Sequence, residues 1–221
     1  MPFPKPFGSM DGATHLTQFA IAQTEKLAAA IESYEYKKIP VPEHLTAGIN
    51  QLSTHLQTFQ PGYDIPLVFN TGDDPKEIMH NNLELAWYLS ANVYFHNRLL
   101  NIFDNDLRPT VEDILECLRR AEEIKMKLQP DLLCRDLPVT FPAFVASCNA
   151  IDRRPWKYFW RSMQQYDCPN ISAQWGVVKE IWEFLDDFRA VGAKNLSWVD
   201  LMQVSETMPF RLSDLHESVG V

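Results

Sequence analysis

Apolar residues recur at three- and four-residue steps through several long stretches of the chain, the spacing of one face of an α-helix. The first stretch runs from Asp11 to about Tyr36 and has an alanine-rich centre that favours helix. Two prolines, Pro40 and Pro42, then interrupt the pattern. A second helix is predicted over residues 43–59, because Pro61-Gly62 gives a clear stop after it.

The third stretch, residues 75–104, is predicted to be the central helix of the fold. Asp74 can cap its start, and Pro75 suits the first helical position. Its apolar residues lie nearly all round the helix, which is typical of a buried one. Its polar members therefore need hydrogen-bond partners or a cavity wall. They are Glu84, Asn92, His96, Asn97 and Arg98.

Two more long helices follow. The one predicted over residues 109–128 places Glu116 before Arg120, and Glu123 before Lys127, at the i,i+4 spacing that favours ion pairs on a solvated face. Residues 130–138 are predicted to form a loop. The helix predicted over residues 170–188 carries two adjacent apolar stripes at 100° per residue. One is Ile171, Trp175, Val178, Trp182 and Leu185; the other is Val177, Ile181, Phe184 and Phe188.

These patterns predict an all-α fold of seven or eight helices packed around residues 75–104, with little or no sheet. Residues 1–10 are interpreted as a tag or a disordered leader, because prolines break up the segment and Gly8-Ser9-Met10 resembles an expression scar. Residues 11–221 are expected to form a single helical domain, as a fragment of a larger protein.

The formal net charge of the 221-residue chain is −9, with 20 Lys and Arg against 29 Asp and Glu. Such a balance disfavours direct binding of nucleic acid by this fragment. The nearest approach to a basic cluster is Arg153, Arg154, Lys157 and Arg161, interpreted as a solvated helix face. No apolar run reaches the roughly 18–20 residues of a membrane-spanning helix, so no membrane partner is expected.

The four cysteines are widely spaced, and no two form a C-x-x-C pair of the kind that zinc sites use. Cys117, Cys134, Cys148 and Cys168 are therefore interpreted as reduced, mostly buried thiols of an intracellular protein. A disulfide between two of them is the alternative.

Motifs for catalysis and metal binding are missing from the sequence: there is no G-x-S-x-G, P-loop or G-x-G-x-x-G. His80 and Glu84 are spaced like two metal ligands, but one such pair on a helix is common. Asp104 and Asp106 lack the glycine and glutamate of a calcium loop. Cys148 has no basic neighbour before Arg153 to stabilise a thiolate. We therefore predict no enzyme, no catalytic residue and no metal site.

The segment from Phe141 to Ala150, FPAFVASCNA, resembles the "W/F-P-x-F-I-A-G/A-C-E-A" element of a fungus-specific family, with Ser147 and Asn149 where that element has Gly and Glu. Downstream residues follow in matching order: Trp156, Trp160, Tyr166, Asn170, Trp175, Val178, Ile181 and Trp182. Ser197-Trp198-Val199-Asp200 closes the match. The chain thus resembles the C-terminal regulatory domain of fungal zinc-cluster transcription factors, the second fungal-specific transcription factor domain class.

This resemblance implies a non-enzymatic regulatory domain of a nuclear protein, which senses a small metabolite or mediates dimerisation and co-regulator contact. It implies no cofactor in this fragment, because zinc belongs to a separate six-cysteine DNA-binding module. The expected partners are a small-molecule effector and a second copy or a co-regulator protein.

Aromatic helices can line an apolar pocket, and Trp87, Tyr94, His96 and Trp182 are the candidate lining residues. The alternative is that all four are core residues. The alternative function is a structural interaction module, like a kinetochore-type relative with the same fold. A helical enzyme is a third possibility, which would require His80, Glu84 and another acid around one ion.

Overall fold

The structure is a computed structural model that describes residues 7–58, 60–62, 65–103, 105–192 and 196–204. Within these ranges the chain forms eight α-helices, two short 3₁₀ turns and no strand. The helices are α1 (His15–Tyr36), α2 (Glu43–Thr58), α3 (Pro75–Leu99), α4 (Arg108–Leu128), α5 (Phe141–Cys148), α6 (Arg154–Met163), α7 (Pro169–Ala190) and α8 (Trp198–Val204); the 3₁₀ turns are η1 (Asn105–Leu107) and η2 (Gln164–Tyr166). None of the described helices is both long enough and apolar enough to cross a membrane.

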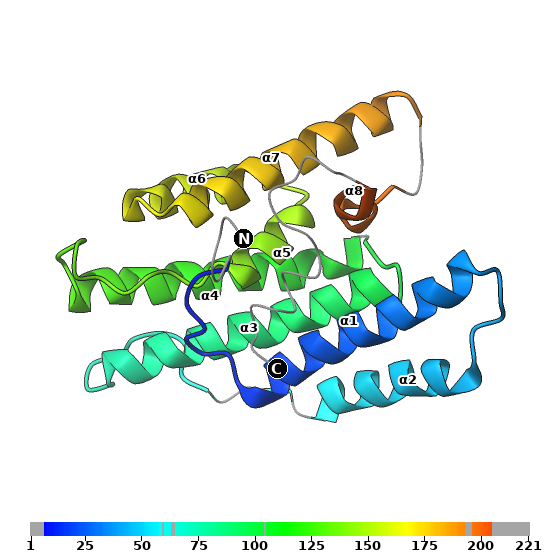
Figure 1. Cartoon of the computed structure of the whole chain (residues 1–221). Helices are drawn as coiled ribbons and strands as arrows, with labels where there is room; N and C mark the ends of the chain where they lie inside the picture. The colour runs from blue at the N-terminus through cyan, green and yellow to red at the C-terminus, as the bar shows by residue number, and fades with distance from the viewer. Residues whose placement is uncertain (1–6, 59, 63–64, 104, 193–195, 205–221) are drawn as a thin grey trace.

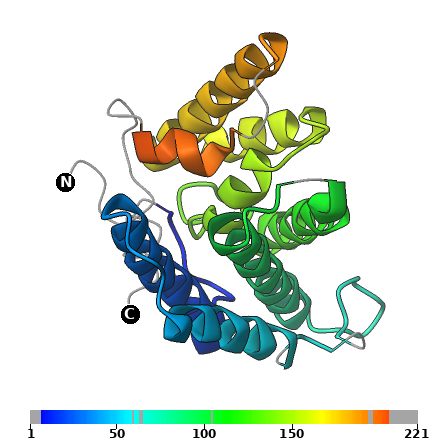
Figure 2. The same cartoon turned by 90° about the vertical axis from the view of Figure 1, so that its right-hand side faces the viewer.

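The helices form two groups that meet at α5. In the lower group α3 packs against α1 and α4, and α2 lies beside α1 (Figure 1), where its Leu56 O accepts a hydrogen bond from the Tyr88 hydroxyl of α3. The upper group consists of α6, α7 and α8, and α5 lies between the two groups (Figure 2). The predicted all-α fold around a buried central helix is therefore confirmed.

Local sequence explains where α3 begins. Asp74 Oδ1 accepts a hydrogen bond of 3.0 Å from the backbone N–H of Lys76, and Pro75 takes the first helical position, as predicted. The predicted end at residue 104 is wrong, because α3 stops at Leu99. Asn101 turns into the left-handed region with φ 56°, and the N–H of Ile102 bonds back to His96 O at 3.0 Å.

The polar residues of α3 find partners rather than a cavity. Arg98 Nε donates to Glu25 Oε1 at 2.9 Å, and Arg98 also pairs with Glu32. The Tyr94 hydroxyl donates to the same Glu25 carboxylate. Because Glu25 and Glu32 lie on α1, this network ties α1 to α3.

The helix α5 is the centre of the core, because each of its eight residues is buried. The Phe141 ring stacks on Trp87 at 5.0 Å, and Phe144 meets Trp198 edge-on at 6.2 Å. The Trp160 indole Nε1 donates to Ser147 Oγ at 2.8 Å, and the Trp182 indole Nε1 donates to the Ser147 backbone O at 2.9 Å. The segment that carries the family resemblance is thus the junction of both helix groups.

The helix α7 departs from the prediction on one face. Four residues of the first stripe, Ile171, Val178, Trp182 and Leu185, are buried, and so are Val177 and Ile181 of the second. Phe184 and Phe188, however, are 41% and 39% exposed. The second stripe is therefore only partly buried, and the prediction that it packs into the core is wrong for Phe184 and Phe188.

The segment before α1 packs on the domain. Residues 1–6 of the predicted tag or leader lie outside the described residues, but Phe7 is only 1% exposed and meets Phe141 and Phe144 edge-on. The Thr140 hydroxyl donates to Phe7 O at 2.8 Å, and Gly8 forms an isolated bridge with Val139. Phe7 and Gly8 of the segment predicted to be a tag or leader therefore pack against the helical domain in the structure.

Candidate functional site

A cleft of about 710 Å³ opens between α4, α6 and the loop that follows α4. One wall is apolar and aromatic, and its members are Met126, Tyr158, Phe159, Met163 and Tyr166. The charged side chains of the lining are Arg119, Glu122, Glu123, Arg135, Asp152 and Arg154. Apolar surface therefore lies beside fixed polar groups in one concave site.

The amphipathic sequence of α6 builds this wall. Trp156, Phe159, Trp160 and Met163 form its buried face. Arg154, Tyr158 and Ser162 follow one another at four-residue steps on a neighbouring face, which is the face that looks into the cleft. Tyr158 is 71% exposed, so an aromatic ring stands at the rim of the cleft.

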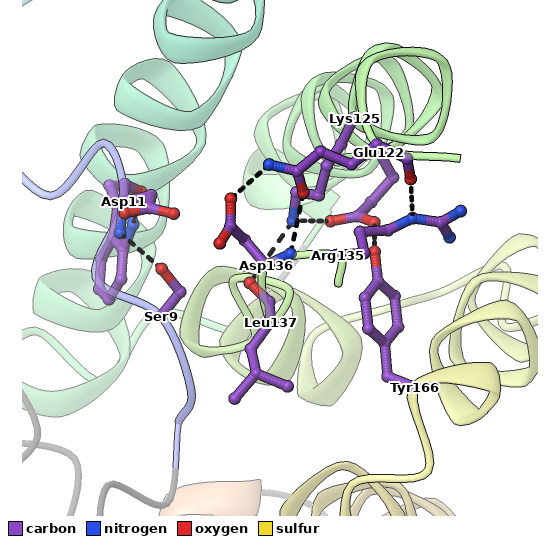
Figure 3. Close-up of polar contacts among 10 residues, drawn as sticks. Ser9, Asp11, Glu122, Lys125, Arg135, Asp136, Leu137 and Tyr166 are labelled. Carbon is purple, nitrogen blue, oxygen red and sulfur yellow. Dashed lines mark hydrogen bonds and ion pairs between the residues drawn. The ribbon is translucent and has the colours of Figure 1, made fainter. Parts of the chain in front are cut away.

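The floor of the cleft contains a buried carboxylate, Glu122, held between two donors (Figure 3). Lys125 Nζ lies 2.7 Å from Glu122 Oε1, and the Tyr166 hydroxyl donates to Oε2 at 2.6 Å. Burial and then the nearby Glu122 charge raise the pKa of Tyr166 above its usual range. The phenol therefore stays protonated and continues to donate to the carboxylate.

The loop wall is fixed to the end of α4. Arg135 donates to the carbonyls of Gln129 at 2.8 Å and Pro130 at 3.0 Å. Gln129 Nε2 donates to Asp136 Oδ2 at 2.6 Å, and the backbone N–H of Asp136 donates to Gln129 Oε1 at 2.9 Å. The Arg135 guanidinium also lies 5.8 Å from the centre of the Tyr166 ring. These contacts fix the loop wall of the cleft to the end of α4.

The rim carries opposite charges in pairs. Arg154 holds Asp152 through Nε at 3.1 Å and Nη2 at 2.9 Å. Hydrogen bonds from the Arg154 side chain and backbone lower the pKa of Asp152 to about 2. Arg119 lies 3.8 Å from both Glu116 and Glu123. Such a rim can orient a polar group of a bound molecule.

The four candidate lining residues are not brought together in this cleft. Trp87 and Tyr94 are fully buried core residues, and Trp87 Nε1 donates to Asp11 O at 2.9 Å. His96 is half-buried, with Nδ1 2.7 Å from Asn92 O. Trp182 is buried as well, at the floor of a separate groove between α6 and α7.

The residues considered for metal binding remain scattered. His80 Nε2 lies 3.8 Å from Glu84 Oε2 on an exposed face of α3. Among the residues that the structure describes, no three His, Cys, Asp or Glu side chains meet in a group suited to a metal ion. Asp104 lies outside the described residues.

The cysteines are free thiols in the structure. Burial raises the pKa of Cys117 to about 11 and the pKa of Cys148 well above its usual range. Both thiols are therefore poor nucleophiles at neutral pH. Cys134 is exposed and Cys168 is half-buried.

Sequence reasoning missed the cleft because its walls are far apart in the chain. One signal was available. Tyr158 follows Arg154 at i+4 and lies outside the apolar face of α6 formed by Trp156 and Trp160. An aromatic residue on the polar side of an amphipathic helix is a reasonable pointer to a binding surface.

The comparisons with known proteins agree with this architecture. The model of a family described as fungal specific transcription factor domain matches residues 12–211. Neither the curated proteins nor the solved structures contain a match to the chain. The family match extends over most of the sequence and confirms the resemblance carried by the FPAFVASCNA segment. The chain belongs to the fungal specific transcription factor domain family.

Proposed function

We propose that this domain regulates a fungal transcription factor by binding a small organic effector in the cleft between α4 and α6. The family is one of transcription factor domains and not of enzymes, and it implies a function in the nucleus. The proposed effector has an apolar body, which contacts Tyr158 and Phe159, and a polar group, which reaches the charged rim.

The observation that carries the proposal is the preformed cleft itself. Its volume of about 710 Å³ lies within the roughly 300–1,000 Å³ range of small-molecule sites. The Arg135 contacts fix the loop wall, and the pairing of Glu122 with Lys125 and Tyr166 fixes the floor. A site that is already ordered loses little conformational entropy when a ligand binds.

The position of α6 suggests how binding would act on the rest of the domain. Phe159 contributes to both the cleft wall and the core, and the neighbouring Trp160 bonds to Ser147 of α5. An effector with higher affinity for one arrangement of α4 and α6 would shift the domain toward that arrangement. The change would then reach α5, where both helix groups meet.

Native mass spectrometry of the chain expressed in a fungal host tests this function. We expect a small molecule to be retained by the native protein and released on denaturation. Ser162→Trp places an indole in the cleft from an exposed position and should abolish retention. Thr54→Trp makes the same change beside the cavity of about 570 Å³ between α1 and α2, and should leave retention intact.

If the Ser162→Trp protein still retained the small molecule, the effector would bind at a site other than this cleft. A ligand-free dimer would instead favour the alternative function, a structural interaction module. The partly exposed Phe184 and Phe188 on α7 are the feature that would support such a dimer.

A further inference from the structure

A second groove lies on the opposite side of α6, between α6 and α7. It has a volume of about 410 Å³, and its lining includes four basic residues, Arg153, Lys157, Arg161 and Lys179. Only two acidic residues, Glu183 and Asp186, line the same groove. The groove is thus basic on a chain whose net charge is −9.

The basic side chains are arranged at a regular spacing. Arg153, Lys157 and Arg161 follow one another at four-residue steps from the N-cap of α6 into the helix, which contains no acidic residue. Four residues of helix rise by about 6 Å, so these charges form a line rather than a cluster. Lys179 faces this line from α7.

The floor of the groove is a rigid aromatic surface. The Trp175 ring stacks on Trp160 with 6.1 Å between centroids and meets Trp182 edge-on at 5.4 Å. Trp160 and Trp182 are both fixed by hydrogen bonds to Ser147. Trp175 is only half-buried, so part of this floor is accessible.

Two cations already lie over this floor. The Arg153 guanidinium is 5.2 Å from the centre of the Trp182 ring, and Lys179 Nζ is 5.6 Å from that of Trp175. Arg153 Nη1 also donates a hydrogen bond of 2.6 Å to Asp186 Oδ2. This bond and the nearby charges of Arg153, Arg189 and Lys157 lower the pKa of the Asp186 carboxyl. Lys157, Arg161 and Lys179 remain exposed at the rim.

We propose that this groove binds an acidic amphipathic helix of a partner protein. Carboxylates at i,i+4 spacing on the partner would match the exposed Lys157 and Arg161, and an apolar side chain between them would contact Trp175. Charge complementarity favours a short acidic segment over nucleic acid. A long polyanion would extend past the groove onto a surface that is acidic in net charge.

This inference does not depend on the effector cleft. The cleft uses Arg154, Tyr158 and Ser162, whereas the groove uses the other polar face of α6. Binding of an acidic helix is expected in protein without effector. Failure of one proposal would therefore leave the other standing.

Fluorescence anisotropy with a labelled synthetic peptide tests the inference. The peptide is an alanine-based helix with glutamate at every fourth position and leucine beside each glutamate. We expect saturable binding by the full chain that weakens as the salt concentration rises from about 50 to 200 mM, because exposed charges are screened. Lys157→Glu combined with Arg161→Glu should weaken binding by about tenfold or more, since attraction becomes repulsion.

A matched variant and two altered probes complete the design. Lys26→Glu with Lys37→Glu reverses two exposed charges on and next to α1, and should change affinity less than about twofold, because these charges are outside the groove. A peptide with glutamine for glutamate should not bind, and one with serine for leucine should bind more weakly. Circular dichroism verifies that both charge-reversed proteins are folded.

Three results would overturn the inference. The first is absence of binding by the parent chain, and the second is an equal loss in both charge-reversed proteins. The third is tighter binding of a labelled mixed-sequence DNA duplex than of the peptide, which would make the groove a nucleic-acid surface.

Discussion

The indole Nε1 of Trp198 donates a hydrogen bond of 3.0 Å to Oδ1 of Asn97, although the two residues are 101 positions apart in the sequence. The same oxygen accepts from Asn149 Nδ2 at 2.8 Å, and Asn97 Nδ2 donates to Ile102 O. A single buried amide on α3 thus holds the C-cap of α5 and the start of α8. Few side chains other than asparagine could donate and accept in this geometry.

Substitution of this amide should be costly. Asn97→Leu removes the acceptor for the Trp198 indole in the core, and we expect it to lower the free energy of unfolding by about 2–3 kcal/mol. Urea unfolding followed by circular dichroism measures the change. Asn50→Ala, at an exposed position of α2, should stay within about 0.5 kcal/mol of the parent. A similarly small effect of Asn97→Leu would contradict the role assigned to this amide.

The buried pair of Glu122 and Lys125 gives a second stability test. Lys125→Met leaves the buried Glu122 carboxylate with the Tyr166 hydrogen bond but without its neighbouring cation, and should destabilise the domain by about 3–5 kcal/mol. Adding Glu122→Gln removes the uncompensated charge and should recover at least about 1 kcal/mol of this loss. Chemical denaturation of the two single variants and the double variant measures these changes in the free energy of unfolding. Strictly additive changes would argue against a coupled pair.

Alkaline pH should unfold the domain through its buried phenols. Burial and then the Glu25 charge raise the pKa of Tyr94 well above its usual value of about 10. The neutral phenol therefore contributes stability that is present below pH ~10 and is lost as pH rises toward the folded-state pKa. Each such tyrosine adds a slope of about −1.4 kcal/mol per pH unit above pH ~10.

Denaturant titrations between pH ~9 and ~11.5 measure that slope. Tyr94→Phe should make the slope less negative by about 1.4 kcal/mol per pH unit, the contribution of one proton. Tyr36→Phe, at a 90% exposed position, should leave the slope as in the parent chain. Identical slopes for the parent and Tyr94→Phe would show that Tyr94 does not couple to folding.

Thiol labelling should separate the cysteines by burial. With a pKa of about 11, Cys117 has only about one thiolate per thousand molecules at pH 8, and Cys148 is deprotonated still less. Ellman's reagent should therefore modify Cys134 first and Cys168 more slowly, with Cys117 and Cys148 reacting only after denaturation. Cys134→Ser should remove the fast phase, and a fast reaction that persists in this variant would place another thiol at the surface.

Helix positions could be predicted well where local chemistry decides them. Asp74-Pro75 and Pro40 mark boundaries because capping and proline geometry act over a few residues. The end of α3 could not be predicted, because Ile102 and Phe103 continue the apolar pattern after Asn101 has already turned. The exposure of Phe184 depends on whether another helix or loop covers its side chain, and the local sequence pattern does not predict this.

The candidate site was less predictable than the fold. The sequence pattern of Trp87 and Tyr94 was compatible with a pocket wall and with the core. In the structure both rings pack against Phe141, so both are core residues. The cleft depends on Arg135 folding back to Gln129 and on Tyr166 reaching Glu122, which is 44 residues away. Contacts of this kind follow from the assembled fold, so sequence periodicity cannot reveal them.

The contact of Phe7 with the core has a consequence for synthesis of the protein in the cell. Thr140, which bonds to Phe7, follows it by 133 residues. At about 5–20 residues per second, a ribosome makes Phe7 roughly 7–27 s before it makes Thr140. During that interval Phe7 lacks its native contacts with Thr140, Phe141 and Phe144, so the segment around Phe7 is the natural place for a chaperone to act.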